Sequence, residues 1–385
     1  MRRMAVFFSG PAGCVFLALI ILGWSNFFLR AEEQFPILVY MLLVVFLGFV
    51  ANLLHLDDSF RASVAGHERL WDLCLIIVMA ALIWLFREDH YNLFLLGSIM
   101  AYSIAVLGLN VQLGYAGVIN FSCASFFGIG SYTAALLMTR AGIPPLPGLV
   151  AGGVVAALIG CVLLLPVLRT SGHYAALVTM AFALLLRVFL DVSEWFGGPQ
   201  GITVQPMSLF GLDFSRNIVF GETELSFYLK YDAAFLLLLC LAFSLVRRVE
   251  RSWIGLALDA VRSDETASAC FGVNIMRWKI TAFTLGNFLS GTAGAMYAMM
   301  LAYISPANFT FADSLLFLSI LLLGGIGNIR GVLLATVFVV LIPEKFQVIQ
   351  EYRYLIYSAL VLLMIVFRPM GLLPRRPRVY SGGRA

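Results

Sequence analysis

The side chains that most often perform catalysis are few in this sequence and are not arranged as a known active site. Its 4 histidines show neither the HExxH spacing of a zinc protease helix nor a metal-binding cluster. No lysine follows a glycine-rich phosphate-binding loop, and no two cysteines form a CxxC motif. We therefore expect no catalytic residue, no metal site and no cofactor within this chain.

Uncharged polar residues and glycines gather instead over residues 110–133, between two apolar runs. Transporters place irregular backbone and polar groups at membrane depth, where broken helices line a solute pathway. The segment therefore predicts a substrate pathway, although glycine-mediated helix packing would give the same pattern. The candidate pathway residues are Gly114, Tyr115, Gly117, Asn120, Ser122, Ser125, Gly128, Gly130, Ser131 and Thr133.

One further charge falls inside an apolar run, and its role can be read in two ways. Arg187 precedes Asp191 by one helical turn, so the two side chains could form an ion pair. Alternatively, Arg187 could attract the carboxylate of a substrate, because an intramembrane charge is costly and often functional.

The composition requires these residues to be positioned by helices in a membrane. Of 385 residues, 61% are hydrophobic and 12% are charged, whereas about a quarter are charged in soluble proteins. The apolar runs are too long for the alternating strands of a β-barrel. We expect an all-α integral membrane protein, a polytopic bundle of about 10–12 transmembrane segments that includes broken helices. The predicted spans are 13–30, 36–54, 70–86, 93–109, 117–139, 147–168, 174–190, 232–249, 279–302, 314–325, 331–342 and 354–368.

The distribution of charge predicts the orientation of these spans. Most lysines and arginines fall on one side when both termini are placed in the cytoplasm, as the positive-inside rule requires. This also accounts for the net charge of +4 without nucleic acid as a partner. The expected organisation is peripheral transmembrane helices over 1–92, a core over 93–374 with an external loop at 191–231 and a cytoplasmic loop at 247–278, and a basic cytoplasmic tail over 375–385 that anchors the topology at the lipid headgroups.

The cytoplasmic loop predicts a short helix that needs a partner surface. Ser263 is a candidate N-cap, and Gly272 stands where a left-handed C-terminal cap would. A helix of about eight residues frays by itself, so it must dock on the bundle or on another protein. The residues assigned to this contact are Asp264, Glu265, Ala267, Phe271 and Gly272.

This loop resembles the coupling loop of ABC importer permeases, in particular those for branched-chain amino acids. The similar motifs follow the order of that family along residues 108–374: Gly114-Tyr-Ala-Gly117, Phe126-Phe-Gly-Ile-Gly130, Tyr174-Ala-Ala-Leu-Val-Thr179, Gly197-Gly-Pro-Gln-Gly201, Gly255-Leu-Ala-Leu-Asp259, Gly291-Thr-Ala-Gly294, Gly324-Gly-Ile-Gly327 and Arg368-Pro-Met-Gly371. The sequence departs from the family at Val118-Ile-Asn-Phe-Ser-Cys123, where a Gln-Leu-Ser-Leu-Gly-His type of stretch is usual.

The resemblance implies a transport subunit without its own ATPase site in a bacterial inner membrane. Its partners would be a second, homologous permease subunit, two cytoplasmic ATPase subunits that hold ATP and Mg²⁺, a periplasmic solute-binding protein and membrane lipid. Because the departure falls among the pathway residues, a permease for urea or short-chain amides remains an alternative. A stand-alone ion-coupled carrier is a third possibility, but such carriers have acidic residues within spans, and we find none apart from positions at span ends.

Overall fold

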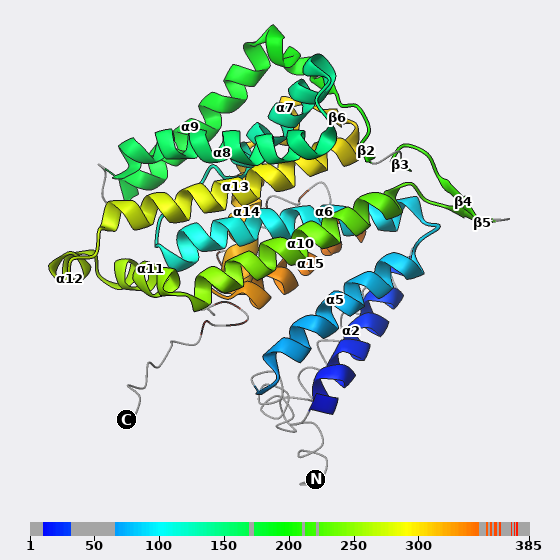
Figure 1. The fold of residues 1–385 in the computed structure, drawn as a ribbon, viewed down its shortest axis with the longest axis horizontal. Helices are drawn as coiled ribbons and strands as arrows, with labels where there is room; N and C mark the ends of the chain where they lie inside the picture. The colour runs from blue at the N-terminus through cyan, green and yellow to red at the C-terminus, as the bar shows by residue number, and fades with distance from the viewer. Residues whose placement is uncertain are drawn as a thin grey trace. The chain divides into compact units, whose positions relative to one another are not determined.

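The computed structural model describes residues 11–31, 66–168, 173–209, 212–220 and 223–345, and single positions of the C-terminal region up to Arg375. Helices dominate these residues, and the strands form only short pairs (Figure 1). Six of the described helical stretches are long and apolar enough to cross a membrane: Pro11–Arg30, His90–Tyr115, Pro145–Leu168, Tyr174–Val192, Tyr228–Arg251 and Pro306–Gly324. The chain is a helical, multi-pass membrane protein, which confirms the predicted fold class.

The chain forms two compact units, and the first comprises Met1–Leu96, Asn217–Leu237 and Ile342–Gln347. Within it, α2 (Pro11–Arg30) packs against α5 (Glu68–Leu85). The Ser226 backbone N–H donates to the Arg87 carbonyl at 2.9 Å, and its hydroxyl lies 2.7 Å from His90 Nδ1. These bonds tie the start of α10 (Tyr228–Arg251), which follows the hairpin of β4 (Ile218–Phe220) and β5 (Thr223–Leu225), to the start of α6 (His90–Leu109).

The second unit comprises Gly97–Arg216, Leu238–Leu341 and Val348–Ala385. Its centre is a mutual packing of α7 (Cys123–Ala141), α8 (Pro145–Leu168) and α13 (Ile275–Leu301). Glycines permit the close approach: a Cβ on Gly130 would lie 2.0 Å from the Gly291 carbonyl oxygen, and one on Gly294 would lie 1.9 Å from that of Phe127. Small residues at helix contacts are the usual way for membrane helices to pack tightly.

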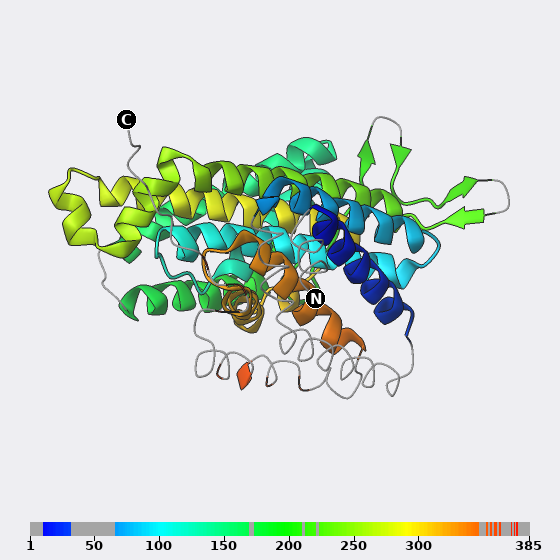
Figure 2. The same ribbon diagram turned by 90° about the horizontal axis from the view of Figure 1, so that it is seen from below.

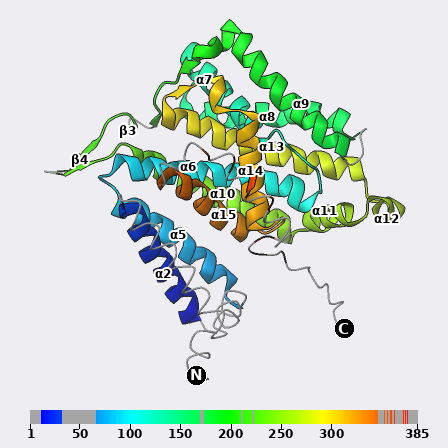
Figure 3. The ribbon, with the colours of Figure 1, turned by 180° about the vertical axis from the view of Figure 1, so that it is seen from behind.

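The remaining elements of the second unit surround this centre. Figure 3 shows α14 running across the direction of α13, and Figures 1 and 2 show α12 at the end where α13 begins. The second unit further contains α9 (His173–Val192), η2 (Glu194–Phe196), η3 (Gly198–Gln200), β1 (Ile202–Thr203), β2 (Ser208–Leu209), β3 (Leu212–Asp213), α11 (Trp253–Ser263), α12 (Glu265–Cys270), β6 (Tyr303–Ile304), η4 (Pro306–Asn308), α14 (Phe311–Gly324) and α15 (Ile329–Lys345). The last residues of α15 belong to the first unit.

The helices deviate from regular α-helix at two places where the sequence predicts broken helices. Helix α6 continues as the π-helix η1 (Asn110–Tyr115), which ends in an irregular segment. Helices α14 and α15 are separated by a turn in which Gly325 and Gly327 have φ angles of 105° and 87°. Helix α14 has 14 residues and α15 has 17, but α14 continues η4 in the stretch Pro306–Gly324, which is long enough to cross a membrane. That 314–325 and 331–342 are two half-helices therefore stays a prediction.

The predicted boundaries fail most clearly at the start of α7. The span expected over 117–139 begins at Cys123, because Gly117 has a left-handed φ of 69° and the Asn120 side chain accepts hydrogen bonds from Ser122. Asparagine side chains that bond nearby backbone favour turns over helix. The predicted span 36–54 lies outside the described residues, and only isolated positions of 354–368 lie within them.

Candidate functional site

The π-helix carries the first part of a buried network of side-chain amides. Gln112 Nε2 donates to Asn287 Oδ1 at 2.8 Å and to the Phe283 carbonyl at 3.1 Å on α13. Asn120 Nδ2 donates to Gln112 Oε1 at 2.7 Å. The Asn120 Oδ1 atom accepts from the backbone N–H and the hydroxyl of Ser122 at 2.8 and 2.6 Å. The network therefore joins η1 and the segment that follows it to α13, which is distant in sequence.

All members of this amide network (Gln112, Asn120, Ser122 and Asn287) are at most 1% exposed and none is titratable. The Asn287 Nδ2 atom nevertheless has no hydrogen-bond partner among the residues that the structure describes. A buried polar atom without a partner costs about 1–3 kcal/mol. Such amides can bind the neutral and charged polar groups of a small solute, but they cannot transfer a proton.

Gln112 belongs to the polar segment 110–133 that the sequence predicts to line the pathway, whereas the sequence gives no such assignment for Asn287. The available signal was an isolated amide within an apolar helix, which is clear for Asn287 in the predicted span 279–302. The sequence cannot show that this amide meets Asn120, because the two residues are far apart along the chain.

Beside the amide network, the end of η1 contacts the turn between α14 and α15. The Gly327 N–H donates to Asn110 Oδ1 at 2.8 Å, which connects η1 to the turn between α14 and α15. A Cβ on Gly114 would lie 2.3 Å from Asn110 Oδ1 and 2.9 Å from the Gly327 nitrogen, so only glycine fits there. Tyr115 is fully buried next to this contact. The predicted residues Gly114, Tyr115 and Gly117 thus form a bend between buried surfaces.

The predicted pathway residues on α7 lie in helix contacts. The Ser131 hydroxyl donates to the Gly294 carbonyl at 2.8 Å, and the Thr133 hydroxyl donates to the Ile129 carbonyl at 2.7 Å. A Cβ on Gly128 would lie 2.8 Å from the Phe309 ring. Ser125 is buried, and its hydroxyl has no hydrogen-bond partner in the part of the chain that the structure describes. The surroundings of Gly128, Gly130 and Ser131 are those of packing residues, and their role in a pathway stays a prediction.

Asp232 is a buried acidic residue that sequence analysis placed at a span end. Helix α10 begins four residues earlier, at Tyr228, so Asp232 lies within the helix. Its side chain is fully buried, and neither carboxylate oxygen has a hydrogen-bond partner within the described ranges of the chain. The expectation that acidic residues are confined to span ends is therefore wrong at this position, because the helix starts earlier than its apolar run.

The loop that the sequence predicts to be cytoplasmic forms two helices, where the sequence predicts one. Ser252 caps α11 by accepting from the Ile254 N–H, and Ser263 is the last residue of α11. The prediction of Ser263 as N-cap is wrong: Asp264 caps α12 by accepting from the Ala267 N–H at 3.0 Å. A carboxylate accepts this bond more strongly than a hydroxyl, so the helix starts one residue later.

The residues assigned to a partner contact project from this loop. Phe271 is 89% exposed, which is unusual for a large apolar side chain. Ala267 and Cys270 are exposed as well, whereas Ser268 on the opposite face is buried. Gly272 has a φ of 79°, as expected for a left-handed cap. Glu265 forms an ion pair with Lys279 at 2.7 Å, a contact that the sequence does not reveal.

The loop at the other end of the second unit is held to the bundle by specific contacts. Arg140 donates to the Trp195 carbonyl at 2.7 Å, and its guanidinium lies 4.8 Å from the centre of the Trp195 ring. Strands β1 and β6 pair through Ile202 and Ile304. The ring of Trp195 remains 61% exposed, so this ordered loop presents an aromatic group.

Arg187 forms the ion pair that the sequence gives as one of its two possible roles, and the attraction of a substrate carboxylate stays a prediction. Its Nε atom lies 3.8 Å from an Asp191 carboxylate oxygen one turn later on α9. Both side chains are more than a third exposed, so the pair contributes little stability.

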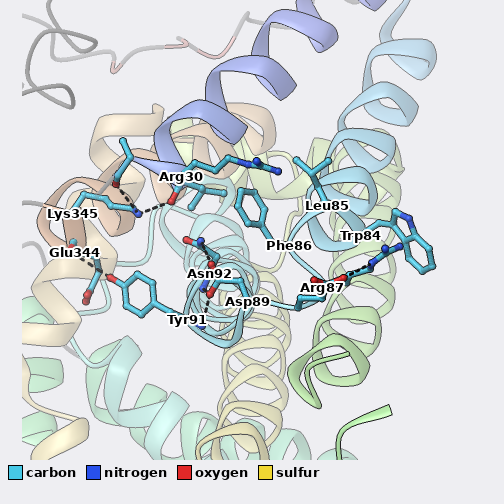
Figure 4. A pocket seen from close by; sticks show the side chains of 13 residues that line it. Arg30, Trp84, Leu85, Phe86, Arg87, Asp89, Tyr91, Asn92, Glu344 and Lys345 are labelled. Carbon is cyan, nitrogen blue, oxygen red and sulfur yellow. Dashed lines mark hydrogen bonds and ion pairs between the residues drawn. The ribbon is translucent and has the colours of Figure 1, made fainter. Parts of the chain in front are cut away.

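The first unit contains a polar depression of about 930 Å³ at the ends of α2, α5 and α15 (Figure 4). Lys345 Nζ donates to the Leu29 carbonyl at 2.7 Å, and Asn92 Nδ2 donates to an Asp89 carboxylate oxygen at 2.6 Å. Charged side chains that line this depression thus form hydrogen bonds with other groups of the chain. None of the predicted pathway residues lines it.

Comparison with known proteins gives consistent results. The family described as "Branched-chain amino acid transport system / permease component" matches residues 91–366. The chain is 36% identical over 327 residues to the high-affinity branched-chain amino acid transport system permease protein LivM of Salmonella typhimurium, covering 81% of this chain and 76% of the relative. LivM of Escherichia coli K12 gives the same identity and coverage. LivH of Escherichia coli K12, a permease protein named for the same transport system, is 24% identical over 310 residues, covering 75% of this chain and 96% of the relative. No solved structure matches.

Proposed function

This chain belongs to the family of branched-chain amino acid transport permeases, and from that premise we propose that it is the pathway-forming subunit of an ATP-driven importer for branched-chain or related amino acids. The observation that carries the coupling part of this proposal is the exposed, capped helix α12 with Phe271 at its end. Ala267, Cys270 and Phe271 are exposed together at this helix, and a contiguous exposed apolar surface supports a contact with a partner protein.

The proposed partners follow from the family and from the two ends of the second unit. A second, homologous permease subunit completes the pathway, as relatives named LivM and LivH suggest. Two cytoplasmic ATPase subunits bind α11 and α12 and carry ATP and Mg²⁺, and this chain itself is not an enzyme. A periplasmic solute-binding protein docks on the loop around Trp195. The chain spans the bacterial inner membrane with both termini in the cytoplasm, in contact with lipid.

The solute pathway passes the amide network. An amino acid has a carboxylate that accepts hydrogen bonds and an ammonium group that donates them. The amides of Gln112, Asn120 and Asn287 offer both donors and acceptors. In this proposal the solute exchanges these internal hydrogen bonds for its own as the helices separate.

Two alternatives keep a specific observation in their favour. A urea or short-chain amide permease would use the same neutral amides, which pair with amides as well as with ions. An ion-coupled carrier would need a titratable group within a span, and Asp232 is one.

The decisive experiment removes the apolar contact of α12 without touching the bundle. We expect Phe271→Asp to abolish co-purification of the ATPases and ATP-dependent uptake in membrane vesicles, while Phe271→Leu retains both. Since the side chain is exposed, neither change should lower the amount of folded permease. Wild-type uptake by Phe271→Asp would contradict the coupling role, and uptake of urea but not of leucine by the wild type would contradict the substrate class.

A further inference from the structure

The first residue of the C-terminal basic tail makes contacts that a simple membrane anchor does not require. The guanidinium of Arg375 donates two hydrogen bonds to the Asp259 carboxylate on α11, at 2.7 and 2.8 Å. The same group lies 4.7 Å from the centre of the Tyr115 ring. The side chains of Arg375 and Asp259 are 18% and 25% exposed. The prediction that this tail serves only as a topology anchor therefore does not account for Arg375.

A second arginine joins α11 to the same bend. Arg262 Nη1 donates to the carbonyl oxygen of Gly114, in the last turn of η1. The last carbonyls of a helix lack partners within it and favour nearby positive charge. The aliphatic part of Arg262 lies against Gly117, where a Cβ would be 3.3 Å from Cγ. We call Asp259, Arg262 and Arg375 the arginine clamp.

The clamp also reaches the turn between α14 and α15. A Cβ on Gly327 would lie 2.6 Å from Arg375 Cδ and 3.4 Å from Arg262 Nη1. Three elements therefore meet at the clamp: helix α11, the π-helix η1 and the turn at Gly327.

The charges around Arg262 and Arg375 affect how strongly each guanidinium holds its proton. Burial lowers the pKa of the Arg262 guanidinium, and the positive charge of Arg375 lowers it further, whereas Asp259 raises it. Burial by itself would lower the pKa of Arg375, but its hydrogen bonds and charge attraction to Asp259 outweigh this and raise it. Bidentate pairs between arginine and a carboxylate fix geometry as well as charge.

We propose that the arginine clamp transmits the movement of α11 to η1, so that Arg375 and Arg262 are positioning residues for coupled transport. This inference rests on the proposed function. When the ATPases displace α11, the clamp moves Gly114 and Tyr115 with it. Gln112 lies two residues before Gly114 in η1 and carries the amide network, so the displacement reaches the hydrogen bonds to Asn120 and Asn287.

The test compares transport with ATP hydrolysis in the assembled importer reconstituted in vesicles. We expect Arg375→Gln and Asp259→Asn to leave hydrolysis largely intact and to lower leucine uptake per ATP hydrolysed about tenfold, the effect of losing one charge-assisted hydrogen bond. Arg378→Gln removes the same charge from the tail and should keep the wild-type ratio. Exchanging the partners, with Asp259→Arg and Arg375→Asp together, should restore part of the ratio, because it restores the ion pair.

The outcomes separate the clamp from the proposed function. An unchanged ratio in Arg375→Gln, or an equal loss in Arg378→Gln, would overturn the clamp while leaving an ATP-driven importer in place. If Arg375→Gln does not assemble, Arg375→Lys decides by the same ratio, since lysine keeps the charge but cannot form the bidentate pair. Uptake by the wild type that needs no ATP would overturn both proposals.

Discussion

The ion pair between Glu265 and Lys279 allows a sharp test of how α12 acts. Glu265 lies in the first turn of α12, where its charge favours the helix dipole and any basic group on a docked ATPase. It also lies 2.7 Å from Lys279 on α13, whose side chain is 17% exposed while that of Glu265 is 55% exposed. Glu265 can therefore stabilise α12 through the ion pair with Lys279, contact a docked ATPase, or do both.

The free-energy costs expected for the two interactions distinguish these roles. An exposed ion pair contributes about 0.2–1 kcal/mol to stability, so Glu265→Arg should cost little in folding. A like charge placed opposite a basic partner at an interface costs several kcal/mol. We therefore expect Glu265→Arg to reduce ATPase association and uptake by more than a hundredfold, a loss that the internal pair cannot produce.

The assay is co-purification of the ATPases together with ATP-dependent uptake in membrane vesicles. The matched control reverses the internal pair, with Glu265→Lys and Lys279→Glu in one chain. We expect this double variant to fold normally and still to lose ATPase association. Restored transport in the double variant would show that Glu265 acts only within the chain, and normal transport in Glu265→Arg would refute an ATPase contact at this residue.

The other predictions address topology, selectivity and the buried acid. Single cysteines at Ser215 and Ser263, in a chain without the native cysteines, should be labelled from opposite sides of the membrane, and labelling of both by an impermeant reagent on intact cells would reverse this conclusion. Asn120→Leu and Ser122→Ala should change the uptake ratios among leucine, a smaller amino acid and urea, since an unpaired polar group costs about 1–3 kcal/mol; unchanged ratios would place the pathway elsewhere. Asp232→Asn should retain ATP-driven uptake and yield at least as much folded protein, because it removes a buried charge without a partner; loss of uptake with normal folding would instead favour ion coupling.

Much of the fold could be predicted because the bilayer imposes simple rules on the sequence. The long apolar runs locate the helices, and glycines locate the breaks at Gly117 and between α14 and α15. The rules fail at helix ends, where polar side chains decide. Asp264 rather than Ser263 caps α12, and α10 starts before its apolar run and so buries Asp232.

The site was less predictable, because its contacts join distant segments. The sequence shows a polar segment around Asn120 but not that Asn287 completes the network from α13. It shows a basic tail but not that Arg375 binds Asp259. A charge in a tail has the same local pattern whether it meets lipid or protein, so only the folded chain separates the two.

The distribution of titratable groups in the second unit favours mechanical over ionic coupling. The amide network of Gln112, Asn120 and Asn287 is neutral at every physiological pH, so its state cannot be changed by a proton. Asp232 belongs to the first unit. The network is connected through η1 to the arginine clamp, of which Asp259 and Arg262 lie on α11 and Arg375 in the C-terminal tail. In the proposed mechanism the network is therefore opened by movement of α11, where we propose that an ATPase binds.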